Sequence, residues 1–368
     1  MSKKRQANFE LLRIVAMFMI IALHYLVKGG IAVPFAENDS SVNYVAWLIE
    51  AFCIVAVNCY ILISGYFLAE SEWKPGRVVS LLCQVLFYAL LIPCVMLGTG
   101  MLSWRDMGIY DWIGCVLPIE TEHYWFATSY LLLYLFAPFL ASGIRQMEKR
   151  QLQIVTALLL FFFSVGKTIF PVKLVTDQYG YSFGWFLCLF VFAGYIRRYG
   201  IPWLEKQSHA AAGYLLSCLL IWGLSYGSHV LAGRIDAFSY YENMPYTYNH
   251  LLCLTGAVSL FYLFKNMKIR ESGISEMICT LAPYTFGVYL MHEHVLVRYE
   301  WMKWLRIEQV AGSYRFVLHL VGCVLMVYSA GSAVDMVRAW LFHKAASWFG
   351  RLDNRQEKSR GRCAGKDE

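Results

Sequence analysis

The chain has 368 residues, of which 58% are hydrophobic and only 15% are charged, a composition that excludes an ordinary soluble domain. It predicts an all-α, polytopic integral membrane protein. The formal net charge of +7 is concentrated at the chain ends and in alternate loops, so it does not indicate nucleic-acid binding.

Apolar runs separated by short polar or Gly/Pro-marked connections predict about ten transmembrane helices. We expect them to begin near residues 9, 44, 78, 123, 152, 183, 210, 250, 278 and 315. With a cytoplasmic amino terminus, 21 of the 32 Lys and Arg residues fall on the inner side and nine on the outer side. This bias predicts that both termini are cytoplasmic. We expect one transmembrane domain over residues 1–343 and a short basic cytoplasmic tail over 344–368.

The first span contains two ionisable side chains, Arg13 and His24, with ten residues between them. Eleven helical steps return to within about 20° of the starting direction and rise about 16 Å, so both side chains share one helix face. Ionisable groups at membrane depth are costly and therefore indicate function. The His24 imidazole suits a general base or a transient acyl carrier, and the Arg13 guanidinium suits a phosphate. A helix-bridging histidine and an arginine that reaches the membrane surface are the structural alternatives.

The end of the second span contains Ser64, and Arg77 precedes the third span. Small residues in a span usually serve close helix packing. A nucleophilic serine needs an adjacent base, and the local sequence offers none. We therefore expect Ser64 to line a cavity.

The fourth span opens with His123, Tyr124, Trp125 and Phe126 at the expected outer interface. Such a cluster is typical of the aromatic belts that anchor membrane proteins. It also fits the wall of an acceptor site, because the face of a tryptophan ring stacks on sugars. The sequence leaves both interpretations open.

The ninth span places His292 at about the depth of His24, so the two imidazoles could line one cavity. His292 and His294 are two positions apart and would point to nearly opposite sides of a helix, so no metal is expected. In the last span, Asp335 and Arg338 are three positions apart, which predicts an ion pair.

Four motifs follow one another along the chain: NFELLRIVAMFMIIALH with Arg13 and His24, Ile63-Ser64-Gly65-Tyr66, Tyr124-Trp125-Phe126 followed by Tyr134 and Pro138, and Thr285-Phe286-Gly287-Val288-Tyr289-Leu290-Met291-His292. With these motifs in this order, the sequence resembles the membrane-bound acyltransferase family 3, which includes bacterial O-acetyltransferases of surface polysaccharides.

The resemblance implies an acyl-CoA donor, in the simplest case acetyl-CoA, that binds from the cytoplasm. The acceptor would be a hydroxyl of an extracytoplasmic glycan or of its lipid-linked sugar precursor. The protein would lie in the bacterial plasma membrane among membrane lipids, without nucleic acid, and act with envelope-biosynthesis partner proteins. The resemblance implies that Arg13 and His24 are a catalytic pair. We further expect donor contacts from Arg13, Ser64 and Arg77, and acceptor contacts from His123, Trp125, Tyr289 and His292.

A different class of function is also compatible with a polytopic protein of this length: a transporter or exporter of a glycan or a small polar solute. Such proteins often contain inverted repeats and broken helices. The sequence shows no repeat of that kind. The acyltransferase interpretation is therefore preferred.

Overall fold

The computed structural model describes residues 5–121, 123–170 and 178–364, with side-chain environments up to residue 347. Lys3, Lys4, Lys173 and Lys366, which contribute to the charge bias, lie outside the described residues. Within these ranges the chain is helical and contains no strand. The α-helices are α1 Ala7–Leu23, α2 Ser41–Cys53, α3 Ala56–Leu68, α4 Pro75–Gly98, α5 Ile109–Val116, α6 Trp125–Gln146, α7 Lys149–Leu160, α8 Gly166–Ile169, α9 Phe183–Tyr199, α10 Gln207–Ala232, α11 Ser239–Asn243, α12 Leu251–Lys265, α13 Gly273–Leu281, α14 Thr285–His292, α15 Glu300–Trp304 and α16 Phe316–Ala364.

Among the described residues, seven helical segments are long and apolar enough to cross a membrane. A continuous helix satisfies its own backbone groups, which is why such segments are stable in lipid. The protein is therefore a multi-pass membrane protein. The segments are Ala7–Lys28, Ser41–Leu68, Pro75–Gly98, Trp125–Gln146, Lys149–Ile169, Gln207–Ala232 and Phe316–Ser347.

The other three expected spans fall on shorter helices. α9 has 17 residues and α12 has 15. The span expected from residue 278 is divided between α13, a 3₁₀ turn at Ala282–Tyr284 and α14. Pro283 lies in that turn, where its ring interrupts regular α-helical hydrogen bonding. The division matters for function because α13 ends and α14 starts beside α1, where residues of this segment line a cavity.

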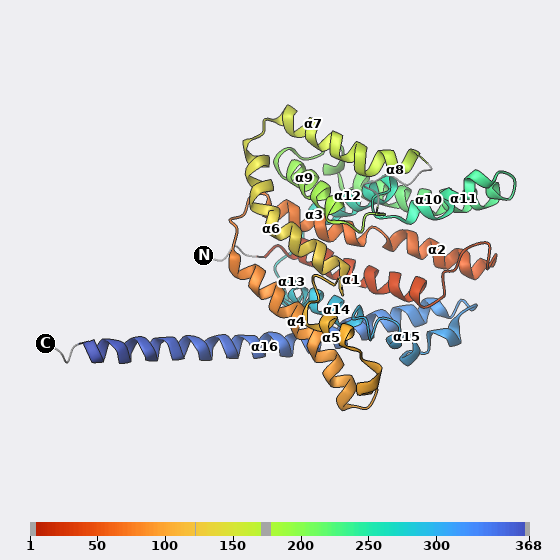
Figure 1. Ribbon diagram of the computed structural model, residues 1–368. Coiled ribbons are helices and arrows are strands. Elements are labelled where there is room, and N and C mark those ends of the chain that lie inside the picture. The colour runs from red at the N-terminus through yellow and green to blue at the C-terminus, as the bar shows by residue number, and fades with distance from the viewer. Residues whose placement is uncertain (1–4, 122, 171–177, 365–368) are drawn as a thin grey trace.

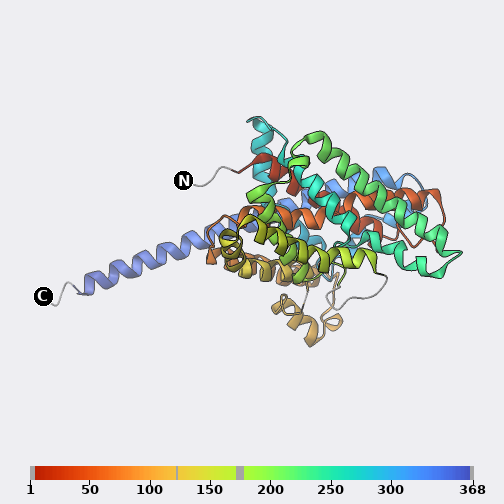
Figure 2. The same cartoon turned by 90° about the horizontal axis from the view of Figure 1, so that it is seen from above.

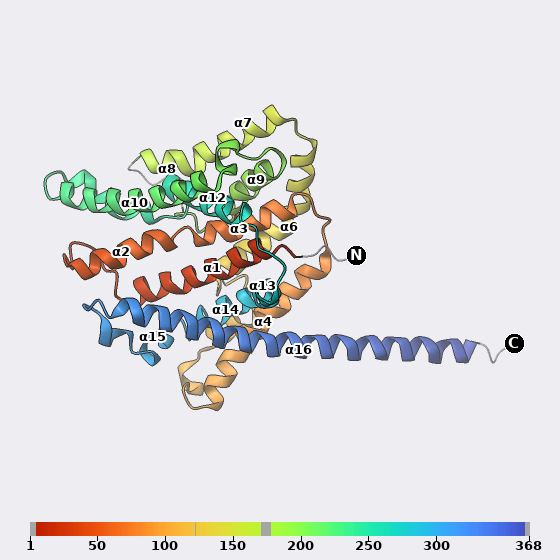
Figure 3. The same ribbon diagram turned by 180° about the vertical axis from the view of Figure 1, so that it is seen from behind.

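α1 lies at the centre of the fold. It packs against α2, α3, α12, α13, α14 and α16. Figure 1 shows α1 between α2 and α3 on one side and α14 and α16 on the other, and the reverse view in Figure 3 agrees. Leu12, Ala16 and Ile21 have no exposed surface, as expected for a helix surrounded by others. Polar side chains on α1 therefore face protein or a cavity.

α14 and α16 pack closely around a buried carboxylate, Asp335. Asp335 forms the predicted ion pair with Arg338, whose Nε and Nη2 donate to the two carboxylate oxygens at 2.7 and 2.9 Å. It also accepts hydrogen bonds from Gln84 Nε2 at 3.0 Å and from the Tyr88 hydroxyl at 2.9 Å. A Cβ atom at Gly287 of α14 would overlap the Asp335 side chain, so this contact requires glycine.

The start of α1 and the end of α16 lie at the same end of the molecule (Figure 1). The carboxyl-terminal part of α16 extends away from the other helices, as the view from above also shows (Figure 2). The opposite end is formed by the end of α1, the start of α2 and the end of α10 with α11.

Candidate active site

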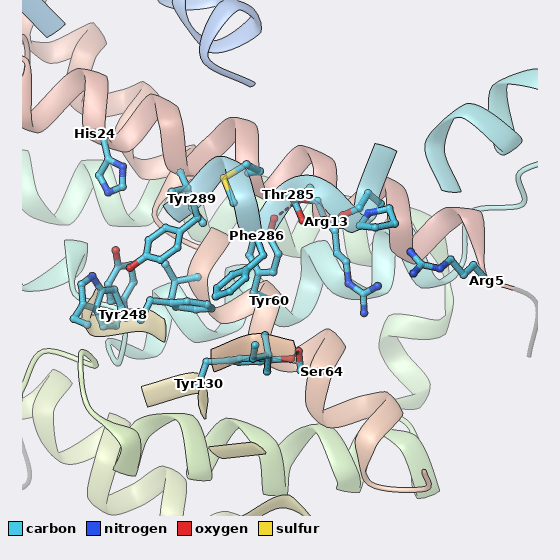
Figure 4. Close-up of a pocket in the computed structure, with 18 residues that line it drawn as sticks. Arg5, Arg13, His24, Tyr60, Ser64, Tyr130, Tyr248, Thr285, Phe286 and Tyr289 are labelled. Carbon is cyan, nitrogen blue, oxygen red and sulfur yellow. Dashed lines mark hydrogen bonds between the residues drawn. The ribbon is translucent and has the colours of Figure 1, made fainter. Parts of the chain in front are cut away.

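A cavity of about 270 Å³ follows α1. Figure 4 shows His24 towards one end and Arg5 at the other, with Arg13 nearer to Arg5. The walls come mainly from α1, α3, α6 and the segment that begins α14. The lining residues are Arg5, Arg13, Met17, Ile20, His24, Val57, Tyr60, Ser64, Leu81, Trp125, Phe126, Tyr130, Tyr248, Ala282, Pro283, Thr285, Phe286 and Tyr289.

Arg13 and His24 both line this cavity, in agreement with their predicted shared helix face. Arg13 Nη1 donates to Glu10 Oε1 at 2.7 Å, and the Glu10 side chain is only 7% exposed. The Tyr60 hydroxyl donates to the Arg13 carbonyl oxygen at 2.7 Å. The first contact orients the guanidinium and the second holds the α1 backbone. Among the described residues the guanidinium makes no further side-chain hydrogen bond, so its other N–H groups are available to an anion.

His24 contacts two groups at the end of α14. Its Nδ1 lies 3.0 Å from His292 Nε2 and 3.2 Å from Glu293 Oε1. His292 Nδ1 lies 2.6 Å from the carbonyl oxygen of Val288, which can only accept, so we assign the His292 proton to Nδ1. His292 Nε2 is then an acceptor, and His24 Nδ1, facing two acceptors, must donate. In the neutral ring this leaves the lone pair on His24 Nε2, the arrangement of a general base.

Lys28 completes this charged cluster. α1 continues into a π-helical turn, His24–Lys28, which places Lys28 near His24. Its Nζ donates to both carboxylate oxygens of Glu293, at 2.5 and 2.6 Å. The Glu293 side chain is 6% exposed and the Lys28 side chain 22%. The ion pair thus compensates the buried carboxylate while leaving it in contact with His24.

The end of α14 explains why His292 and Glu293 contact His24 while the next residue, His294, packs elsewhere. α14 ends at His292, and Glu293 already has non-helical backbone angles. Because of this change of direction, Glu293 meets His24, whereas the His294 ring packs against His123 with 4.5 Å between ring centroids. His123 is buried and is not among the residues that line the cavity.

Aromatic rings form the cavity wall near His24. The Trp125 ring stacks with Tyr248 at 5.9 Å and 20°. Asn58 fixes this region, because its Nδ2 donates to the Tyr248 carbonyl oxygen at 2.7 Å and its Oδ1 accepts from Trp185 Nε1 at 2.9 Å. Tyr289 also lines the cavity, and its buried hydroxyl, which lies beside the Phe126 backbone, makes no hydrogen bond of good geometry to the described residues. A polar ligand there would find aromatic faces and an available hydroxyl.

The two remaining donor candidates occupy different environments. Ser64 lines the cavity and its Oγ lies 3.2 Å from the Tyr130 hydroxyl. Within the described part of the chain Ser64 has no basic side-chain partner, so its position suits lining rather than nucleophilic attack. Arg77 is exposed near the start of α4 and does not line the cavity.

Sequence reasoning did not assign Lys28, Glu293 or Arg5 to the site, and it left Tyr248 open between ligand recognition and interface anchoring. Glu293 carried a usable signal: it is a carboxylate expected at membrane depth next to His292. Its partner Lys28 lies 265 positions away in the chain, so the pair becomes visible only in the folded structure. Arg5 precedes the first span and resembled an ordinary flanking charge.

The fold and site together define a multi-pass membrane protein with a histidine at one end of a buried cavity and an arginine towards the other. The sequence model of acyltransferase family 3, an acyltransferase domain, matches residues 6–334. The chain therefore belongs to acyltransferase family 3 and is a membrane acyltransferase. Searches of curated proteins and of solved structures found no significant match.

Proposed function

We propose that this protein transfers an acyl group, in the simplest case acetyl, from cytoplasmic acyl-CoA to a hydroxyl of an extracytoplasmic cell-envelope glycan or its lipid-linked precursor. The observation that carries the proposal is the placement of Arg13 and His24 on one cavity, with a cation towards one end and a base towards the other. Their separation along the helix, about 16 Å, suits an extended donor with phosphates at one end and a thioester at the other.

The proposed orientation places both termini in the cytoplasm of a bacterium, with ten crossings of the plasma membrane. The Lys and Arg bias supports this orientation. The common end shared by the start of α1 and the end of α16 is compatible with an even number of crossings. Arg13 would then lie towards the cytoplasm and His24 towards the outside. Acyl-CoA would enter from the Arg5 end.

In the proposed reaction, His24 Nε2 removes the proton from the acceptor hydroxyl as its oxygen attacks the thioester carbonyl carbon. The carbon–sulfur bond then breaks, and the CoA sulfur takes the proton from His24. During the step His24 becomes an imidazolium. The Glu293 carboxylate, 3.2 Å from Nδ1, stabilises that charge, and its hydrogen bond keeps the ring in the required tautomer.

We assign the donor contacts to Arg13 and Ser64 in the cavity, with Arg77 a contact for the exposed nucleotide end. Trp125 and Tyr289 are the proposed acceptor contacts, since an aromatic face and a free hydroxyl suit a sugar. His292 contacts His24, and His123 packs against Tyr124, whose ring contacts Tyr289. Membrane lipids and envelope-biosynthesis proteins are the proposed partners.

The purified full-length protein in detergent tests this proposal. Labelled acetyl-CoA should transfer label to envelope glycan, and His24→Ala should abolish transfer while thermal unfolding stays unchanged. His209→Ala, at a histidine that does not line the cavity, is the matched control. CoA should raise the unfolding temperature of a transferase and leave that of a glycan exporter unchanged. Full activity in His24→Ala would reject the mechanism.

A further inference from the structure

Three potential metal ligands meet beside the cavity. One ring nitrogen of His24, one of His292 and a Glu293 carboxylate oxygen all lie within 4.8 Å of one another. The contacts from His24 Nδ1 are 3.0 Å to His292 and 3.2 Å to Glu293. Donor atoms around a tetrahedral ion with bonds of about 2.0–2.1 Å stand roughly 3.4 Å apart. The three side chains are therefore close to the spacing that a bound ion would require.

The sequence argument against a metal considered only His292 and His294 on one helix. The structure replaces His294 with His24 of α1 and adds Glu293 beyond the end of α14. Two imidazoles and one carboxylate form a donor set typical of Zn²⁺. The hydrogen bond from His292 Nδ1 to the Val288 carbonyl oxygen directs the free lone pair of Nε2 towards this set, as supporting contacts of metal-binding histidines do.

A cation already occupies this neighbourhood. The Lys28 ammonium lies 2.5 and 2.6 Å from the Glu293 oxygens. Its side chain is 22% exposed, whereas that of Glu293 is 6% exposed, so the lysine has a route outwards and the carboxylate does not. A divalent ion would compete with Lys28 for Glu293. It would also coordinate the two imidazole nitrogens, whereas the ammonium is bound to the carboxylate alone.

We propose that His24, His292 and Glu293 form an inhibitory site for a Zn²⁺-class ion, which displaces Lys28 from Glu293. Binding switches off His24 by changing its tautomer. A metal bond to Nδ1 requires that this nitrogen lose its proton, and the neutral ring then carries its one proton on Nε2. Nε2 has no lone pair left to accept a proton from a hydroxyl. Mg²⁺ and Ca²⁺ prefer oxygen ligands and should not bind.

Binding is measured on metal-free, full-length protein in detergent, by calorimetric titration with ZnCl₂ and by the visible absorption of Co²⁺. We expect one ion per chain. Glu293→Gln and His292→Ala should each weaken binding at least about tenfold, because each removes a ligand. Lys28→Met should tighten binding about tenfold, because it removes the competing charge. Cys83→Ser, which removes an exposed thiol outside the cluster, should leave binding unchanged.

The effect on His24 is measured without turnover, so it does not depend on the proposed acyl transfer. Diethyl pyrocarbonate acylates imidazole nitrogens that carry a lone pair, and mass spectrometry quantifies the product at His24. Zn²⁺ should protect His24 in the wild type and not in Glu293→Gln. Equal Zn²⁺ affinity in wild type, Glu293→Gln and His292→Ala would overturn the site. Unchanged His24 acylation at saturating Zn²⁺ would overturn the switch.

Discussion

Replacing Glu293 by glutamine tests the charge that supports His24. Glutamine keeps the size and an acceptor oxygen but removes the negative charge 3.2 Å from His24 Nδ1. At an effective dielectric constant of about 20, a full charge pair at this distance is worth about 5 kcal/mol, which is a ceiling. Lys28 opposes the imidazolium from the other side of the carboxylate. If Lys28 halves the stabilisation of the His24 imidazolium by Glu293, about 2–3 kcal/mol remains. Its loss corresponds to a fall in kcat of about 30- to 150-fold.

The assay follows thiol release from acetyl-CoA by the full-length protein with glycan acceptor. We expect kcat to fall and the KM for acetyl-CoA to stay constant, because Glu293 does not line the cavity. The glutamine variant also leaves Lys28 without its carboxylate, so its unfolding temperature should fall. In the double variant Lys28→Met/Glu293→Gln the stability should recover while kcat stays low. A kcat of Glu293→Gln within twofold of wild type would refute the assigned role.

Three further variants probe the donor, the packing and the acceptor. Arg13→Gln should raise the KM for acetyl-CoA at least about tenfold and remove thermal stabilisation by CoA, whereas an unchanged KM would exclude a phosphate contact. Gly287→Ala should destabilise the protein by about 1–3 kcal/mol in reversible unfolding, because its methyl group would overlap Asp335; wild-type stability would show that α14 and α16 are less tightly packed. Trp125→Ala should raise the KM for the glycan about two- to tenfold and leave the rate of acetyl-CoA hydrolysis without glycan unchanged. An unchanged KM for the glycan with slower hydrolysis would place Trp125 at the donor.

The sequence predicted features that depend on local geometry. Helical periodicity was enough to place Arg13 and His24 on one face, because the chain between them is a regular helix up to Leu23. The ion pair of Asp335 and Arg338 followed from the same rule of spacing. The all-helical fold followed from the apolar runs, because lipid requires internally satisfied backbones.

Features that depend on where helices end were not predictable in the same way. The rule that residues two apart face opposite sides assumes a continuing helix, and α14 stops at His292. The expectation of a continuous ninth span therefore missed the turn after His292 that directs Glu293 to His24. α9 and α12 show the same limit, since hydropathy does not distinguish a long span from a shorter helix surrounded by protein.

The base at His24 depends on packing at a distance. Its Nδ1 partners belong to the end of α14, and α14 is held against α16 where Gly287 meets Asp335. Gly287 and His292 are five positions apart in α14, about 1.4 helical turns, so we expect a shift at the first to move the second through the helix. We therefore expect Gly287 to affect activity as well as stability. If α14 moves away, His24 loses both acceptors that fix its tautomer, and Gly287→Ala should lower kcat by a larger factor than its loss of folded protein explains.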